Sequence, residues 1–285
     1  MRILLAQLAP VAGEVSRNAD RLDAAVRSVH ADLAVFPELY LSGYRVGDRF
    51  HQIALTEGDR LVSSLRRTAK ETGTTLVVGA PLASKDRRGE VRNAALAVTP
   101  TGELHVQVKR YLPNFGPFEE GVPFTPTDVS APVPLAGASV GLQVCYDAFF
   151  PEVSRQLALG GAEILVVISA SPVTSARFFE RLLPARAIEN ALPAVFVNRV
   201  GVEDGMVFAG GSAAWDARGE LMPTTPVDFS PKSPEEWLAW VDVDLAEAAR
   251  YRPFRPVLRD VAQRPGASSA DPSRSAPAST LTRAL

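Results

Sequence analysis

The chain has 285 residues, of which 46% are hydrophobic and 22% charged, and a formal net charge of -2. This composition is typical of a folded globular protein with a substantial core. The interspersed acidic and basic residues give no indication of a nucleic acid or an anionic membrane as partner. No apolar run approaches the roughly 18 residues of a membrane span, and the N-terminus lacks a secretory signal, so we expect a cytoplasmic protein.

Short hydrophobic and β-branched runs predict nine strands. In chain order these are Arg2–Leu8, Leu33–Phe36, Thr75–Ala80, Ala94–Val98, Leu104–Val108, Ser139–Cys145, Ile164–Ile168, Ala194–Val200 and Leu238–Val243.

Helical spacing of apolar residues predicts a helix through Leu22 and Val26, and another that ends before Gly73. Two more helices are expected, one from Pro151 to Gly160-Gly161 and one over about 175–190. Pro184 lies inside the last helix and is expected to kink or divide it, because proline removes a backbone donor.

This order of elements predicts a mixed α/β fold, with helices over the outer faces of the sheets and a single domain at 1–263. Residues 264–285 are rich in Ser, Ala and Pro, which predicts a flexible C-terminal tail. The chain has one cysteine and three scattered histidines, and it lacks the G-x-G-x-x-G and phosphate-loop motifs. We therefore expect no metal ion and no cofactor.

Three reactive side chains stand at or beside the ends of predicted strands, where a rigid scaffold commonly presents catalytic groups. Cys145 precedes a predicted helix, and proximity to a helix N-terminus would lower its thiol pKa. Glu38 lies between apolar neighbours, which would raise its pKa toward that of a general base. Lys109 offers a positive charge for an oxyanion, while Arg110 should face the other way.

Each of these residues also has an ordinary interpretation. Cys145 alone would be a small buried hydrophobe, Glu38 an exposed loop residue and Lys109 a solvated surface charge. Their combination favours a catalytic site over three independent structural roles.

The ordered motifs F-P-E at Glu38, K-R-Y-L-P at Lys109 and V-C-Y-D-x-x-F-P-E at Cys145 resemble those of the nitrilase, or carbon–nitrogen hydrolase, superfamily. The resemblance extends from Arg2 to about Val243. Later segments that match the family's blocks are SASP, ARAIEN, VNRVG and VFAGGS.

The resemblance implies a four-layer αββα sandwich and a Glu–Lys–Cys triad that hydrolyses carbon–nitrogen bonds other than peptide bonds. It also implies a homodimer or a higher homo-oligomer. Family members commonly carry a second glutamate four residues before a phenylalanine, which points to Glu120 rather than Glu119. Its implied role is to keep Lys109 charged and to orient the substrate.

The expected reaction is attack by Cys145 on a small linear amide or carbamoyl compound, with Glu38 as base, Lys109 at the oxyanion, and water completing hydrolysis. Ammonia leaves and a thioester remains. Residues expected to line the substrate pocket, from their positions within matching blocks, are Tyr44, Phe115, Tyr146 and Ser169.

Three alternatives stay open. The segments YLPNFGPFEEG and GVEDGMVFAGGS resemble the glutaminase domains of glutamine-dependent NAD synthetases, which favours a glutaminase subunit feeding ammonia to a separate synthetase. Those domains usually carry an acidic residue directly after the nucleophile, where this chain has Tyr146. A nitrilase would share the triad, and a non-enzymatic binding protein would share the fold.

Overall fold

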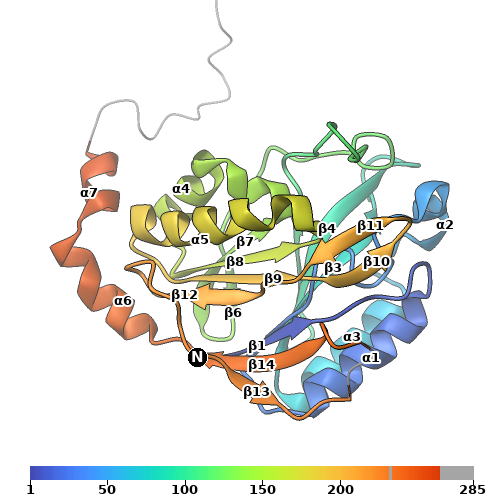
Figure 1. Ribbon diagram of the computed structural model, residues 1–285, viewed down its shortest axis with the longest axis horizontal. Coiled ribbons are helices and arrows are strands. Elements are labelled where there is room, and N and C mark those ends of the chain that lie inside the picture. The colour runs from blue at the N-terminus through green and yellow to red at the C-terminus, as the bar shows by residue number, and fades with distance from the viewer. Residues whose placement is uncertain (231–232, 264–285) are drawn as a thin grey trace, which may run out of the picture.

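The computed structural model describes residues 1–230 and 233–263, which form two stacked β-sheets between two layers of helices (Figure 1). The predicted tail at 264–285 lies outside the described residues, so the predicted domain boundary stays a prediction.

The first sheet has seven strands, and the second has five. In spatial order the first sheet contains β13 (Thr225–Val227), β14 (Trp237–Asp242), β1 (Arg2–Gln7), β2 (Leu33–Val35), β3 (Thr75–Ala83), β4 (Val91–Val98) and β5 (Leu104–Val108). The second contains β12 (Ala213–Trp215), β9 (Ala194–Asn198), β8 (Ile164–Ser169), β7 (Ala138–Val144) and β6 (Val133–Leu135). A separate antiparallel hairpin consists of β10 (Val200–Glu203) and β11 (Met206–Ala209).

Helices cover the outer faces of both sheets. The first sheet is covered by α1 (Val15–Arg27) and α3 (Arg60–Thr72), and the second by α4 (Pro151–Leu159) and α5 (Ala176–Asn190). The shorter helices are α2 (Phe50–Ile53), α6 (Leu245–Tyr251) and α7 (Val257–Ala262). This arrangement is the predicted four-layer αββα sandwich.

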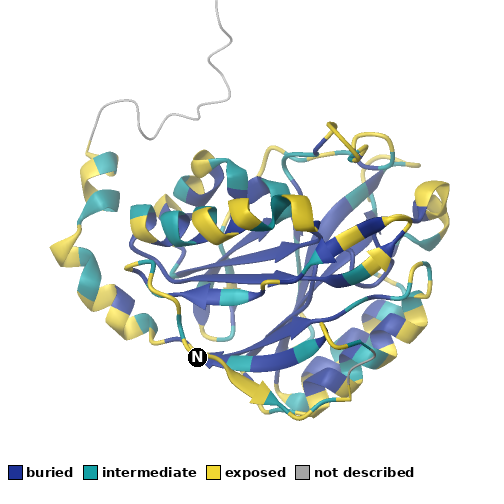
Figure 2. Cartoon of the chain, in the orientation of Figure 1, coloured by how far each residue is buried: buried dark blue, intermediate teal, exposed yellow. Residues whose placement is uncertain are grey.

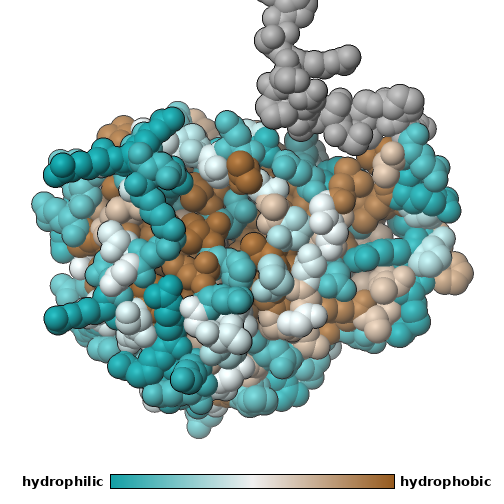
Figure 3. Space-filling view, turned by 180° about the vertical axis from the view of Figure 1, so that it is seen from behind, coloured by the Kyte–Doolittle hydropathy of each residue, from teal (hydrophilic) through white to brown (hydrophobic). Residues whose placement is uncertain are grey.

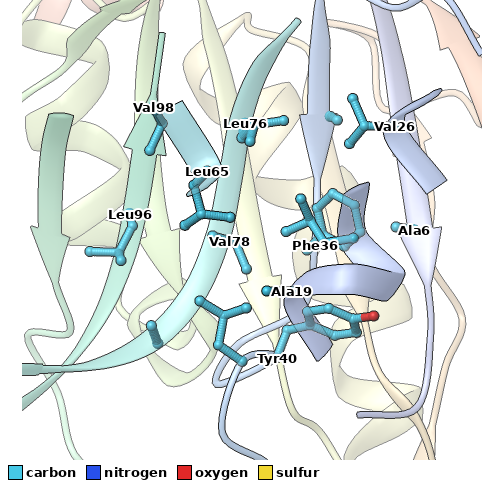
Figure 4. Close-up of a cluster of buried hydrophobic side chains, with 14 of the residues drawn as sticks. Ala6, Ala19, Val26, Phe36, Tyr40, Leu65, Leu76, Val78, Leu96 and Val98 are labelled. Atoms are coloured by element: carbon cyan, nitrogen blue, oxygen red, sulfur yellow. The ribbon is translucent and has the colours of Figure 1, made fainter. Parts of the chain in front are cut away.

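The central strands of both sheets read as continuous hydrophobic runs because both of their faces are buried (Figure 2). On β1, Leu4 and Ala6 face α1 and α3, whereas Ile3 and Leu5 face the second sheet. Figure 4 shows the cluster between the first sheet and its helices, in which Leu65 of α3 lies against Val78 of β3.

The layer between the sheets is also apolar. One cluster in this layer contains Val140, Leu142 and Val144 of β7 together with Leu33 and Val35 of β2. Complete burial of each such side chain contributes about 1.5–3 kcal/mol, so this layer holds the two sheets together.

All four predicted helices and all nine predicted strands are present, with ends that shift by a few residues. The predicted strand Ala194–Val200 is present as β9 but ends at Asn198, and Arg199 separates it from β10. Pro184 was expected to kink or divide its helix; it does not divide it, since α5 continues through it, and the kink stays a prediction. Buried Leu183 and Ala187 pack this helix against the second sheet, which offsets the lost hydrogen bond.

The short strands β6, β10, β11, β12 and β13 escaped the sequence analysis. Each has only three or four residues, too few to show a period. The same holds for α2, α6 and α7, which have seven residues or fewer.

No helix within the described residues is long and apolar enough to span a membrane. On the face opposite that of Figure 1, hydrophobic side chains lie near the middle and are bordered by hydrophilic ones (Figure 3).

Close backbone packing positions the turn that carries Glu38. The Gly79 amide of β3 donates to the Pro37 carbonyl at 3.0 Å, and the Leu41 amide donates to the Gly79 carbonyl at 3.1 Å. A Cβ atom on Gly79 would lie 2.2 Å from the Leu39 amide nitrogen. Only glycine therefore permits this approach of strand and turn.

We predict that Gly79→Ala lowers the free energy of unfolding by about 2–3 kcal/mol, because the methyl group meets backbone that has no free space. Urea unfolding measures the change. Gly58→Ala is the matched control, since nothing lies within 4 Å of a Cβ atom at that position. Equal stabilities of the two variants would contradict the packing argument.

Candidate active site

Glu38 follows β2 and is completely buried. One carboxylate oxygen, Oε1, accepts hydrogen bonds from Asn93 Nδ2 and Lys109 Nζ, both at 2.7 Å. The other, Oε2, accepts from the Ala170 amide at 2.8 Å. A carboxylate has about four acceptor positions, so these donors fix its orientation and leave about one position for a proton to be transferred.

Lys109 follows β5 and is also completely buried. Its ammonium lies 2.7 Å from Glu38 Oε1 and 2.7 Å from Glu120 Oε1. Burial alone would lower the pKa of Lys109, but the carboxylates of Glu120 and Glu38 raise it above its ordinary value, which keeps the ammonium charged. Arg110 is partly exposed, so the expected alternation of the two neighbours is confirmed.

Glu120 is buried, whereas Glu119 is exposed. Glu120 Oε1 accepts a second hydrogen bond, from the Tyr44 hydroxyl at 2.6 Å. Burial raises the pKa of Glu120 to about 7, although Lys109 acts in the opposite direction. Its other oxygen, Oε2, has no hydrogen-bond partner among the residues that the structure describes.

Cys145 stands directly after β7, at the first residue of the 3₁₀ helix η2 (Cys145–Phe149). Its φ of 48° lies in the left-handed region, which is strained for a residue with a side chain. The Ser169 hydroxyl donates to its sulfur at 3.2 Å. The side chain is partly exposed, and it lines a pocket.

The expected lowering of the thiol pKa is wrong. Burial raises the pKa of Cys145, and the nearby carboxylate of Glu38 raises it further, so that the attraction of Lys109 is outweighed. The full helix α4 begins only at Pro151, six positions further along the chain. The resting cysteine is therefore a neutral thiol.

Asp147 connects the two segments that carry Lys109 and Cys145. Its Oδ1 accepts from the amides of Arg110 at 3.0 Å and Tyr111 at 2.9 Å, and its Oδ2 accepts from the Val144 amide at 3.1 Å. Burial raises the pKa of Asp147 to about 6 against these hydrogen bonds. This carboxyl holds the end of β5 beside the end of β7.

A second buried carboxylate holds the loop of Tyr44. Glu203, at the end of β10, accepts from the Tyr44 amide at 3.2 Å and the Arg45 amide at 2.8 Å. It also forms a buried ion pair with Arg199, whose guanidinium lies 3.9 Å from the centre of the Phe208 ring. Glu203 of the β10–β11 hairpin therefore positions Tyr44, whose hydroxyl donates to Glu120.

The pocket in front of Cys145 has a volume of about 80 Å³. Of the four predicted substrate-binding residues, Tyr44, Phe115 and Tyr146 line it, whereas Ser169 is completely buried and lies outside the lining. The lining residues are Tyr44, Pro113, Phe115, Phe118, Glu120, Cys145, Tyr146, Phe149, Ala170, Ser171, Pro172, Ser175, Phe178 and Phe179.

Sequence reasoning missed several residues of this site. Asn93 lies inside β4, where its only signal is a polar residue within an apolar strand. Glu203 lies three positions after the predicted strand Ala194–Val200, at the end of the unrecognised strand β10, and Phe178 resembles any apolar helix residue. A G-x-S-x-G match at Gly137–Gly141 is unrelated to the site, since Ser139 lies within β7.

The fold is a four-layer αββα sandwich. A cysteine, a lysine and two glutamates stand at strand ends or in the loops that follow them. Together these features define one class of hydrolase. The chain belongs to the carbon–nitrogen hydrolase family, whose model matches residues 2–253. It has amidase relatives, and its single cysteine stands at the family's active-site position.

Among curated proteins, an (R)-stereoselective amidase from Pseudomonas sp. is 36% identical over 225 residues, which cover 78% of this chain and 80% of the amidase. A glutamine-dependent NAD(+) synthetase from Rhodobacter capsulatus is 30% identical over 270 residues, 93% of this chain but 47% of the synthetase. The chain thus spans about half the length of that relative.

Among solved structures, a carbon–nitrogen hydrolase superfamily protein from Xanthomonas campestris aligns with a TM-score of 0.79 and 27% identity, covering 91% of this chain and 96% of that one. An amidase variant from Nesterenkonia sp. AN1 aligns with a TM-score of 0.73 and 30% identity, covering 90% and 99%. The latter carries acrylamide added at its active-site cysteine.

We predict that Glu120 makes stability depend on pH. Its pKa is about 7 in the folded protein against an ordinary value of 4.5, so the folded state binds the extra proton between these values. Stability should therefore fall as pH rises from 5 to 7. Relative to Glu120→Gln, which does not titrate, the wild type should lose up to about 1.4 kcal/mol per pH unit.

Urea unfolding of both proteins at pH 5, 6, 7 and 8 measures this difference. Asp147 titrates in both proteins, and its contribution cancels. A difference that is constant over this range would contradict the raised pKa of Glu120.

We predict that Glu203→Gln lowers the free energy of unfolding by about 3 kcal/mol, because Arg199 would remain buried without a carboxylate. Asp204→Asn is the matched control, since Asp204 is 69% exposed in its ion pair with Arg45 and should change stability by less than about 1 kcal/mol. Chemical denaturation measures both, and equal losses would contradict the role of the buried pair.

Proposed function

We propose that this carbon–nitrogen hydrolase cleaves a small linear amide or carbamoyl compound, with Cys145 as nucleophile, Glu38 as general base and Lys109 at the oxyanion. The observation that carries the proposal is the position of the Lys109 ammonium, 2.7 Å from both Glu38 and Glu120, beside a thiol held in strained backbone. The amidase relatives support the same reaction class.

The raised pKa of Cys145 determines how the reaction begins. Because the resting thiol is neutral, its proton must leave as sulfur attacks the carbonyl carbon. Glu38 accepts this proton at its remaining acceptor position. The new S–C bond moves an electron pair to the carbonyl oxygen, where Lys109 and the backbone amide of Tyr146 stabilise the negative charge.

Collapse of the tetrahedral intermediate breaks the C–N bond. Glu38 returns its proton to the nitrogen, ammonia leaves, and a thioester remains on Cys145. Water then attacks the thioester, with Glu38 again taking the proton. The carboxylic acid leaves as the thiol is restored. Glu120 keeps Lys109 charged throughout, and Tyr44 holds Glu120 in place.

A glutaminase role is the second candidate, and it is favoured by the similarity to the NAD(+) synthetase over 93% of this chain. Such a role predicts glutamine hydrolysis that a separate synthetase stimulates. The residue after the nucleophile, Tyr146, offers no charge for an amino-acid ammonium group, so we favour the amidase.

We predict that Cys145→Ala lowers ammonia release by on the order of 10⁴-fold or more, and that Glu38→Gln also abolishes most turnover. Glu119→Gln is the matched control, because this exposed carboxylate lies outside the cluster. A coupled ammonia assay over primary amides, carbamoyl compounds and glutamine measures the rates. Full activity of Cys145→Ala on any amide would refute the mechanism.

The thioester has its own test. Hydroxylamine added during turnover should divert part of the acyl group to a hydroxamic acid, because it competes with water for the thioester. Hydrolysis without any hydroxamate at high hydroxylamine concentration would instead indicate direct attack by water.

A further inference from the structure

The wall of the pocket in front of Cys145 is largely aromatic. Seven of its fourteen lining residues are phenylalanine or tyrosine. They come from four segments that are distant in the chain: the loop after β2, the loop after β5, the 3₁₀ helix η2, and the start of α5. An aromatic lining built from separate segments indicates a pocket for apolar groups.

The rings of this wall contact one another in a continuous series. Centroid distances are 5.4 Å between Phe115 and Tyr146, 5.2 Å between Tyr146 and Phe149, and 6.2 Å between Phe149 and Phe178. Deeper in the wall, Phe179 contacts Phe149 at 5.3 Å. Such contacts stabilise each ring by about 0.5–1.5 kcal/mol and make the surface largely preformed.

The two ends of this series are open to solvent. Phe115 and Phe178 are each 53% exposed, whereas Phe179 is only 3% exposed. The lining therefore changes from a buried floor to a half-exposed mouth. Both mouth residues leave apolar surface that a bound acyl group would remove from water.

Charge is scarce in the same lining. Among the described residues that line the pocket, Glu120 alone is formally charged, and its Oε1 already bonds Lys109 and Tyr44. The cluster of Glu38, Lys109 and Glu120 adds up to a formal charge of −1. A carboxylate on a substrate would lose its hydration here and meet no cation in the wall.

We propose that the preferred substrates are uncharged primary amides whose acyl group is apolar and larger than acetyl, with an arylalkyl or branched alkyl chain. The pocket of about 80 Å³ takes the amide group with its carbonyl carbon facing Cys145, and the acyl chain extends through the open mouth against Phe115, Tyr146 and Phe178. This proposal rests on the proposed amidase function, and it excludes glutamine and N-carbamoyl amino acids as good substrates.

A matched pair of amides tests the charge argument. In 5-methylhexanamide an isopropyl group replaces the carboxylate of 4-carbamoylbutanoate at nearly the same size. We expect kcat/KM to be at least about 100-fold higher for the uncharged amide, because the carboxylate finds no partner. Equal or faster hydrolysis of 4-carbamoylbutanoate would overturn the proposal and leave the amidase function intact.

A matched pair of variants tests the aromatic mouth. Phe178→Ala should lower the ratio of kcat/KM for 3-phenylpropanamide to kcat/KM for acetamide by about 10-fold, since the phenyl group loses its contact surface. Phe254→Ala removes an 86% exposed ring outside the pocket and should leave the ratio unchanged. If Phe178→Ala left this ratio unchanged, the aromatic mouth would have no role in substrate recognition and this part of the proposal would be wrong.

Binding to Cys145→Ala separates the two proposals. If the wild type hydrolyses none of these amides, the proposed function fails, but calorimetry on the variant still tests the pocket. Tighter binding of 3-phenylpropanamide than of 4-carbamoylbutanoate would support the substrate class. Equal binding, or a preference for the carboxylate, would overturn it.

Discussion

The buried ammonium of Lys109 is the constraint on which the site depends. Moving an isolated charge of this kind out of water costs several kcal/mol even after the protein relaxes, so the charge requires close partners. Glu38 and Glu120 meet this requirement from two different segments, each at 2.7 Å. Because Glu38 precedes Lys109 by 71 positions, the fold must bring distant strand ends together before the charge is compensated.

That requirement explains the other buried carboxyl groups around the site. Asp147 holds the ends of β5 and β7 side by side through three backbone amides. Glu203 holds the loop of Tyr44, whose hydroxyl completes the surroundings of Glu120. These groups do not reach the reacting atoms. The two-sheet core is rigid but chemically inert. These carboxyl groups fix the loops at its edge, so that the charged side chains are held in position.

The sequence predicted the parts of this arrangement that follow from local pattern. Buried strands appear in the sequence as apolar runs. Glu38, Lys109 and Cys145 could be predicted as site residues because each follows such a run. Asn93 and Glu203 could not be found in this way, since their roles depend on neighbours more than 50 and 150 positions away. The thiol pKa was mispredicted because the local pattern showed a helix ahead but not the extent of burial or the nearness of Glu38.

The neutral thiol and the preference for an uncharged substrate have one electrostatic cause in common. Burial raises the pKa of Cys145, and a site that already contains two carboxylates and one ammonium raises it further because it stabilises an additional anion poorly. In the proposed mechanism, negative charge appears only when a carbonyl is present to carry it toward Lys109. The same excess of negative charge acts against a carboxylate on the substrate, so the carboxylates that help to keep the nucleophile neutral also favour an uncharged acyl group.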